Sequence, residues 1–155
     1  METPYPSKPP RLSTIFDSHR DPVYFVTFCR FRRRRVLACE TAHQALRTYA
    51  ERGYTEHSIA VGRYVIMPDH VHLFVCGGED FDSGLWVRGL KRAITTALEA
   101  EPPGMAAATI PKFSTPLWQR GFFDHLLRSP ESYAGKWEYV RQNPVRAGLV
   151  AQWED

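Results

Sequence analysis

The sequence predicts an α+β fold in which one antiparallel sheet carries packed helices. Apolar runs of strand character alternate with segments whose apolar residues recur at helical spacing, and a tight turn joins two of the strand-like runs. The expected order is strand, helix, strand, strand, helix, a weaker strand and helix, an arrangement related to the ferredoxin-like group. We expect the helices to cover one face of the sheet.

The first predicted strand and helix occupy the beginning of this pattern. Residues 23–31, VYFVTFCRF, are rich in β-branched and aromatic side chains, which favours a strand. A helix should follow, with Thr41 as its N-cap and Gly53 as the signal that ends it.

A β-hairpin is expected next. The apolar runs 58–67 and 70–78 flank Pro68-Asp69, a pair that favours a turn. The second strand of this hairpin therefore opens with His70.

The remaining elements are a second helix, a weak strand and a final helix. Ser83 is expected to cap a helix that runs to about Glu101, and residues 102–116 should form a mobile connection. The run 116–123, PLWQRGFF, predicts a short strand. Ser129-Pro130-Glu131 supplies a cap, a proline at the first helical position and an acidic first turn, so a last helix should begin there.

Length and composition indicate one globular domain. With 155 residues, 43% of them hydrophobic, the chain can build one ordinary core, which we assign to residues 21–155. The proline-rich residues 1–20 should form a flexible N-terminal arm. The chain has three scattered cysteines and no apolar run near the roughly 18 residues that span a bilayer, so we expect a cytoplasmic protein without membrane partners.

Two histidines of the predicted hairpin suit a metal ion. Alternate side chains share a face of a strand, so His70 and His72 should project together while Val71 points into the opposite layer. Such a pair can chelate one metal, although histidines spaced by two also occur in strands by chance.

The last helix offers a nucleophile and an oxygen donor. Tyr139 and Asn143 are four residues apart, which places a phenol and a carboxamide about one turn apart on one helix face. Tyr133 is rotated by roughly 120° from that face. A lone helical tyrosine is more often a core residue, and Pro144 favours a helix end near Asn143.

Three ordered blocks together resemble one known family. YVIMPDHVHLFV, LWQRGFFDHLLR and YAGKWEYVRQNPVRAGLV are similar to the REP-associated tyrosine transposases, within the single-tyrosine HUH (IS200-like) transposase family, and the similarity covers roughly residues 22–150. The resemblance implies the HUH nuclease fold, metal ligation by His70, His72 and Asn143, and catalysis by Tyr139. It also implies Mg²⁺ or Mn²⁺ as the cofactor.

The same resemblance implies a substrate and a reaction. The substrate would be single-stranded DNA beside imperfect palindromic hairpins, cut through a 5′-phosphotyrosine that leaves a free 3′-hydroxyl for later rejoining. The residue types agree with this chemistry, because a divalent cation neutralises phosphate oxygens and a phenol can act as a nucleophile. Two imidazoles and an amide do not by themselves select magnesium over zinc. Related transposases exist as monomers and as homodimers.

Several cationic side chains are candidate DNA contacts. They follow the first strand, lie on the second helix, or stand among aromatic residues near the weak strand: Arg30, Arg32, Arg33, Arg34, Arg35, Lys91, Arg92 and Arg120. Each group is also compatible with an ordinary solvated surface. We interpret His125 as a structural or capping residue and not as a third metal-binding histidine.

Two other functions remain open. A domesticated, non-catalytic protein that binds DNA or RNA hairpins would keep the fold without turnover, although the intact His70, His72 and Tyr139 argue against it. A metal-dependent hydrolase of small molecules would use water in place of Tyr139 and would tolerate its replacement by phenylalanine.

Overall fold

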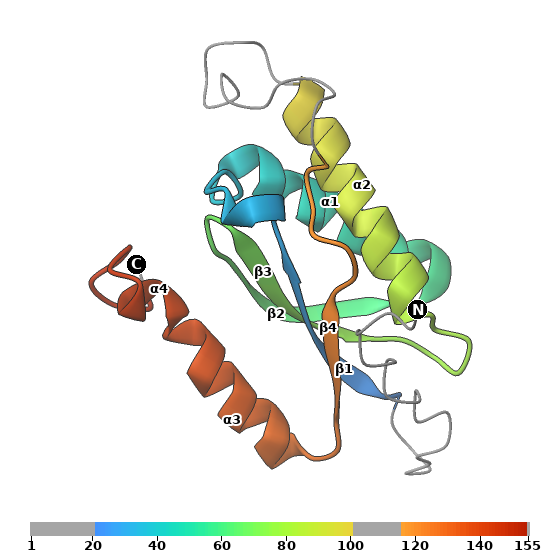
Figure 1. Cartoon of the computed structure of the whole chain (residues 1–155). Helices are drawn as coiled ribbons and strands as arrows, with labels where there is room; N and C mark the ends of the chain where they lie inside the picture. Colours follow the sequence, from blue (N-terminus) through green and yellow to red (C-terminus); the bar gives the residue numbers. More distant parts are fainter. Residues whose placement is uncertain (1–20, 101–115, 155) are drawn as a thin grey trace, which may run out of the picture.

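The computed structural model describes residues 21–100 and 116–154. The predicted N-terminal arm, and all but the last residue of the predicted connection 102–116, lie outside these ranges. Within them the elements follow the expected α+β order, with a short 3-10 turn after the first strand and a one-turn helix near the end (Figure 1).

Four antiparallel strands form the sheet, in the order β2-β3-β1-β4. They are β1 (Val23–Cys29), β2 (Ala60–Ile66), β3 (His70–Cys76) and β4 (Phe123–Leu127). The predicted hairpin is confirmed: β2 pairs antiparallel with β3, which begins at His70. The central position of β3 and β1 places the histidine strand inside the sheet.

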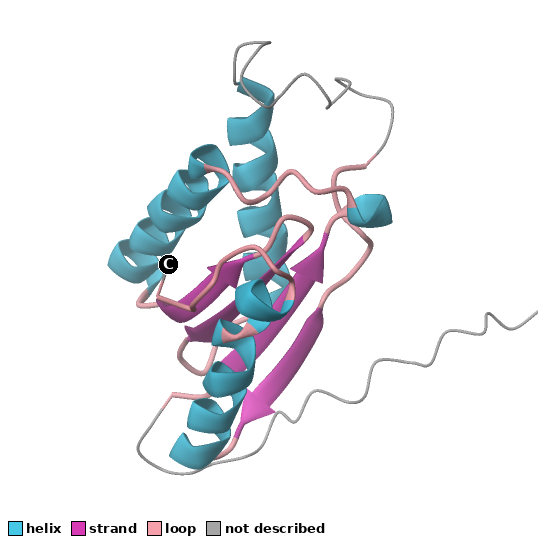
Figure 2. Cartoon of the chain, turned by 90° about the vertical axis from the view of Figure 1, so that its left-hand side faces the viewer, coloured by secondary structure: helices cyan, strands magenta, loops and turns pink. Residues whose placement is uncertain are grey.

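Helices cover both faces of the sheet, so the expectation of one covered face is wrong. Helices α1 (Glu40–His57) and α2 (Ser83–Ala100) lie on one side, and α3 (Pro130–Arg141) lies on the other (Figures 1 and 2). The reason is visible in β3, where the consecutive residues Leu73, Phe74 and Val75 are all buried. A strand that is apolar on both sides needs a cover on each side.

The core accordingly has two parts. Alternate strand residues such as Val26, Val71 and Leu73 pack against the buried faces of α1 and α2. On the other side Phe25, Phe74 and Leu127 pack against Val140 of α3. The described residues contain no helix whose length and apolarity would suit a crossing of the membrane.

Helix α1 begins and ends differently from the prediction. Its N-cap is Cys39, so Thr41 lies inside the helix, and the helix continues past Gly53 to His57. A Cβ atom on Gly53 would stand 3.3 Å from Nε1 of Trp86, so this glycine permits close helix packing and does not end the helix. The left-handed residue at the C-terminus is Ser58, with φ of 54°.

Helix α2 starts at Ser83, but its cap is the preceding residue. Oδ1 of Asp82 accepts a hydrogen bond of 3.0 Å from the backbone N–H of Leu85. Ser83 is buried and donates instead to Asp124 on β4, at 3.0 Å. The helix therefore starts as expected, with the cap shifted by one residue.

The weak strand is displaced along the chain. The predicted run 116–123 forms one isolated bridge, between Trp118 and Arg30, and the regular strand β4 follows at Phe123–Leu127. The start of α3 is confirmed, because the Ser129 side chain accepts from the N–H of Ser132 at 3.1 Å. Helix α3 ends at Arg141, and the one-turn helix α4 covers Asn143–Arg146.

Candidate active site

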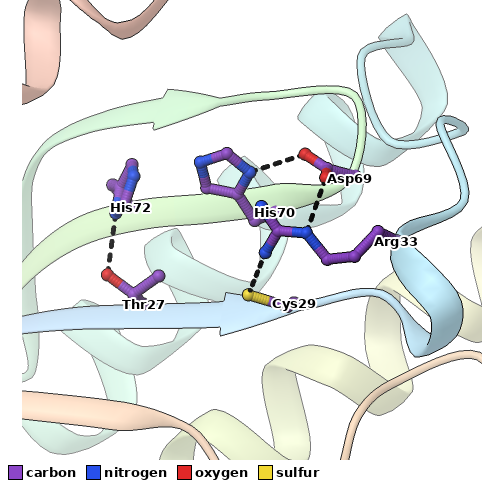
Figure 3. Close-up of polar contacts among 6 residues, drawn as sticks. All are labelled: Thr27, Cys29, Arg33, Asp69, His70 and His72. Carbon is purple, nitrogen blue, oxygen red and sulfur yellow. Dashed lines mark hydrogen bonds and ion pairs between the residues drawn. The ribbon is translucent and has the colours of Figure 1, made fainter.

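His70 and His72 lie side by side on β3, as the alternation of strand side chains predicts. Their ring centroids are 4.7 Å apart and the ring planes are nearly perpendicular, at 82° (Figure 3). Val71 between them is buried on the opposite face, against α1 and α2. The two imidazoles therefore belong to the face that α3 covers.

Each imidazole has one nitrogen engaged by a neighbouring side chain. Nδ1 of His70 is 2.6 Å from Oδ1 of Asp69, and Nδ1 of His72 is 2.7 Å from Oγ1 of Thr27 on β1 (Figure 3). Within the described ranges, no hydrogen bond engages Nε2 of either ring. Metal-binding histidines usually show this arrangement, with one nitrogen held by an outer partner and the other presented to the ion.

Burial determines the charge of His72. Desolvation, followed by the positive charges of His70, Arg33 and Lys136, lowers the pKa of His72 to about 4. At neutral pH the His72 imidazole is therefore uncharged, which is the form that can bind a metal ion.

Asp69 shows the opposite balance. Burial raises its pKa, but the hydrogen bond from His70 and the charges of His70 and Arg33 outweigh burial, so the net pKa lies below its ordinary value. Asp69 is thus a carboxylate, placed between the guanidinium of Arg33, 2.8 Å from Oδ2, and the ring of His70.

Tyr139 lies near the C-terminal end of α3, with 60% of its surface exposed. The neighbouring Val140 is fully buried on the histidine face of the sheet, and Tyr133 packs on Phe74 with ring centroids 4.4 Å apart. The two tyrosines therefore point in different directions, as the spacing predicts. In the part of the chain that the structure describes, no hydrogen bond or ring contact joins Tyr139 to His70 or His72.

Asn143 does not share one helix with Tyr139, because α3 ends at Arg141 and Asn143 opens α4. The placement of both on one helix is therefore wrong, and Pro144 at the start of α4 explains the break. Arg146 nevertheless joins them. Its Nη2 donates to the carbonyl oxygen of Tyr139 at 2.6 Å and to the side-chain oxygen of Asn143, and its guanidinium carbon lies 4.5 Å from the Tyr139 ring centroid.

The arginine segment after β1 is divided between interior and surface. Arg30 is 3% exposed and donates to the carbonyl oxygen of Leu117, and burial, followed by the charge of Arg34, lowers its pKa to about 10. Its guanidinium is thus engaged inside the fold. Arg32, Arg33, Arg34 and Arg35 are all exposed, but Arg33 alone of these four is paired with Asp69, and it donates to Sγ of Cys29 at 2.8 Å.

The other candidate cations also differ in their surroundings. Nζ of Lys91 donates to the carbonyl oxygens of Gln119 and Gly121, at 3.2 and 2.6 Å, and burial lowers its pKa. Lys91 therefore holds the segment before β4 against α2. Arg92 and Arg120 are exposed and remain candidate DNA contacts.

Sequence reasoning missed the partners of the site residues. The sequence pattern places Asp69 in a turn and Thr27 in a strand, and it assigns no role to Arg146. The adjacency of Asp69 to His70 was the available signal for the first. Thr27 and Arg146 become neighbours of the site through strand register and through the break after α3, which the residue pattern does not specify.

The described residues contain no cluster of three or more His, Cys, Asp or Glu side chains that could hold a metal ion. The histidine pair alone suits a divalent cation by donor chemistry and by the engagement of both Nδ1 atoms. A complete site would therefore draw a further ligand from another residue type, such as the predicted amide of Asn143, or from a substrate.

Comparison with known proteins places this geometry in a family. The REP-associated tyrosine transposase of Escherichia coli K12 is 26% identical over 134 residues, which cover 85% of this chain and 71% of that protein. A Haemophilus influenzae protein with a provisional assignment to the same group is 31% identical over 91 residues, or 58% of this chain. That match spans 52% of the relative, about half its length.

A solved structure and a family model agree with these relatives. The structure of a REP-associated tyrosine transposase bound to a REP hairpin superposes with a TM-score of 0.66 at 22% identity, covering 90% of this chain and 78% of that one, and so shares the fold. Residues 20–142 match the family model described as "Transposase IS200 like". Because this match covers most of the chain, the protein belongs to the IS200-like transposase family.

Proposed function

We propose that this protein is a metal-dependent endonuclease and strand transferase that cuts single-stranded DNA near hairpins through a 5′-phosphotyrosine on Tyr139. The observation that carries the proposal is the histidine pair of β3, in which both Nδ1 atoms are engaged and both Nε2 atoms have no hydrogen-bond partner within the described ranges. Membership of the IS200-like transposase family supports the reaction type.

His70, His72 and Asn143 would hold the ion, which we propose to be Mg²⁺ or Mn²⁺. When bound, such an ion supplies positive charge that neutralises and polarises a phosphate oxygen. Asp69 and Thr27 would orient the two imidazoles, and Arg146 would keep the backbone of Tyr139 close to the side chain of Asn143.

The covalent step uses the Tyr139 hydroxyl as the nucleophile. Its oxygen attacks the phosphorus of a phosphodiester and gives up its proton to solvent, while the bond from phosphorus to the 3′-oxygen breaks. The 3′-oxygen takes up a proton from solvent and leaves as a hydroxyl, so the step consumes no net proton. The 5′-phosphate fragment stays on the protein as a phosphotyrosine ester. The reverse attack by a 3′-hydroxyl rejoins a strand, so cleavage and transfer are one reversible reaction. The high exposure of Tyr139 leaves its ring accessible to a large substrate.

Hairpin DNA is the proposed substrate because a structural neighbour is described in complex with a REP hairpin. In this chain the exposed Arg32, Arg34, Arg35, Arg92 and Arg120 are the cations best placed for phosphate contacts, since their side chains are at the surface. We predict that the hairpin is bound by a monomer or by a homodimer.

The decisive experiment follows the covalent bond. Hairpin oligonucleotides with single-stranded flanks, taken from palindromic repeats next to the coding region, are labelled at the 3′ or the 5′ end and incubated with protein and Mn²⁺. We expect the 3′ label to migrate with the protein and the 5′ label to be released on a shorter strand. Tyr139→Phe should abolish the adduct and keep hairpin binding.

Tyr54→Phe is the matched control, because Tyr54 is a similarly exposed tyrosine on α1, with 66% exposure. This variant should form the adduct at the normal rate. An adduct or cleavage that persists in Tyr139→Phe at the wild-type rate would refute the proposed nucleophile. Persistent cleavage without any adduct would favour a hydrolase that uses water, whereas a persistent adduct would point to another nucleophilic side chain.

A second candidate function is hairpin binding without turnover. Two observations favour it: Tyr139 has no hydrogen bond or ring contact with either histidine in the described part of the chain, and the side-chain oxygen of Asn143 accepts from Arg146. Hairpin binding by the wild-type protein, without any covalent adduct in Mg²⁺ or Mn²⁺, would support this function over the enzymatic one.

A further inference from the structure

Asp69 and Thr27 differ in what they can impose on the histidine they contact. A carboxylate can only accept a hydrogen bond, so the 2.6 Å contact between Asp69 and His70 requires a proton on Nδ1 of His70. A hydroxyl can donate or accept, so the contact between Thr27 and His72 is compatible with either arrangement of the His72 proton.

The consequence for a neutral His70 is a fixed tautomer. With its proton on Nδ1, the lone pair lies on Nε2, the nitrogen that no hydrogen bond engages in the described ranges. His72 instead has its ring plane held by Phe25, which is stacked on it with centroids 5.5 Å apart at 18°. Carboxylate contact thus sets the proton of one ring, and aromatic stacking sets the plane of the other.

Asp69 is in turn held by Arg33. Nε of Arg33 is 2.8 Å from Oδ2 of Asp69, so one carboxylate oxygen faces the guanidinium and the other faces the imidazole. Arg33 has the left-handed φ of 53°, a conformation that is uncommon for a residue with a side chain. Its Nη1 also donates to Cys29 on β1, which fixes the guanidinium from a second side (Figure 3).

We propose that Arg33 and Asp69 are positioning residues that lock His70 in the tautomer with its proton on Nδ1 and its lone pair on Nε2. This assigns Arg33 a role at the proposed metal site on β3, because its guanidinium is bound to Asp69, unlike those of Arg32, Arg34 and Arg35. The effect on metal affinity rests on the proposed function, whereas the tautomer is a property of the metal-free protein.

The first measurement is made without metal. Nitrogen-15 chemical shifts of the His70 ring, recorded at mildly alkaline pH, report which nitrogen carries the proton. We expect the proton on Nδ1 in the wild-type protein and in Asp69→Asn, whose amide oxygen can still accept. Asp69→Ala should shift His70 toward the other tautomer.

The second measurement is the dissociation constant for Mn²⁺, from the electron paramagnetic resonance signal of the free ion. Loss of an outer partner of a metal-binding histidine typically weakens affinity about 10–100-fold, which we expect for Asp69→Ala. Asp69→Asn should recover part of this loss, and Arg33→Ala should show a smaller loss in the same direction. Arg34→Ala, a neighbouring exposed arginine, should leave the Mn²⁺ affinity unchanged.

These readouts separate the outcomes. A purely structural role would lower the thermal midpoint of Asp69→Ala without changing the His70 tautomer or the Mn²⁺ affinity, and would overturn the inference. The same holds if His70 in the wild-type protein carries its proton on Nε2. If the tautomer responds as expected but the wild-type protein binds no Mn²⁺, the positioning role stands and the proposed metal-dependent function fails.

Discussion

The two faces of the sheet differ in the residues they bury. On the α1/α2 face, one cluster contains thirteen buried hydrophobic residues among those that the structure describes, and they come from α1, α2, β1, β3 and Leu37. On the α3 face the corresponding cluster has four buried members, and the same strand presents His70 and His72 there. The α1/α2 face therefore provides most of the apolar burial, while the α3 face presents polar groups that a ligand could contact.

The alternation along β3 produces this division. Val71, Leu73 and Val75 point to the α1/α2 face and are each 0–1% exposed. His70, His72 and Phe74 point the other way, and of these only Phe74 is fully packed, against Tyr133 and Trp137 of α3. A chemical site can occupy half of a strand when the other half supplies enough apolar burial to hold the strand in place.

The largest effect is expected from His72→Ala, on the α3 face. Removing one proposed metal ligand should slow adduct formation by about 10²–10³-fold, because the ion contributes several kcal/mol to stabilising developing charge. The rate is measured with the 3′-labelled hairpin at fixed Mn²⁺. Thermal unfolding should remain close to that of the wild-type protein, and a rate within twofold of wild type would remove His72 from the site.

A core substitution on the other face should give the reverse pattern. Leu90 of α2 is 1% exposed, and Leu90→Ala should lower the free energy of unfolding by about 2–5 kcal/mol through lost burial and the cavity left behind. Chemical denaturation measures this change. The folded fraction should still form the adduct at the wild-type rate. A loss of activity in fully folded protein would contradict the separation of stability and activity between the two faces.

The smallest effect is expected five residues before that core position, on the solvent side of α2. Leu85 is 61% exposed, so Leu85→Ala should change the free energy of unfolding by no more than about 0.5 kcal/mol. The same denaturation experiment measures it. A change as large as that of Leu90→Ala would mean that a partner or another segment covers Leu85.

Much of this arrangement could be predicted from local patterns. The tight turn at Pro68-Asp69 fixed the hairpin, and the period of two placed both histidines on one face. The start of α3 followed from Ser129, whose cap is confirmed by the hydrogen bond to Ser132. These features depend on residues close together in the chain, where backbone preference decides the outcome.

The errors arose where distant residues decide. Gly53 is a packing residue because Trp86 lies against it. Lys91 stays a predicted DNA contact, but its ammonium group also donates to the carbonyl oxygens of Gln119 and Gly121, which the sequence pattern did not indicate. Helix α3 packs on the second face of the sheet against Phe25 and Phe74. The hydrophobic pattern of β1 and β3 did not indicate whether helices would cover one face of the sheet or both.

The site was predicted in its residue types but not in its contacts. The spacing of His70 and His72 and the family resemblance named the candidate ligands and the nucleophile. The engagement of Asp69 by Arg33, and of Asn143 by Arg146, requires coordinates, because both depend on how arginine side chains fold back on the chain. The roles of His70, His72, Tyr139 and Asn143 stay predictions.

The central claim is that Tyr139 lies close to an ion bound by His70 and His72. Helix α3 runs toward the end of the sheet where the β2–β3 turn lies, the same end at which His70 opens β3 (Figure 1). Tyr139 lies near the end of α3, so its distance from an ion on the histidines can be tested. The most direct measurement is the broadening of tyrosine ring signals in the nuclear magnetic resonance spectrum when Mn²⁺ is added. We predict that the Tyr139 ring broadens together with His70 and His72, well before Tyr54 on α1. Equal broadening of Tyr139 and Tyr54 would contradict the claim.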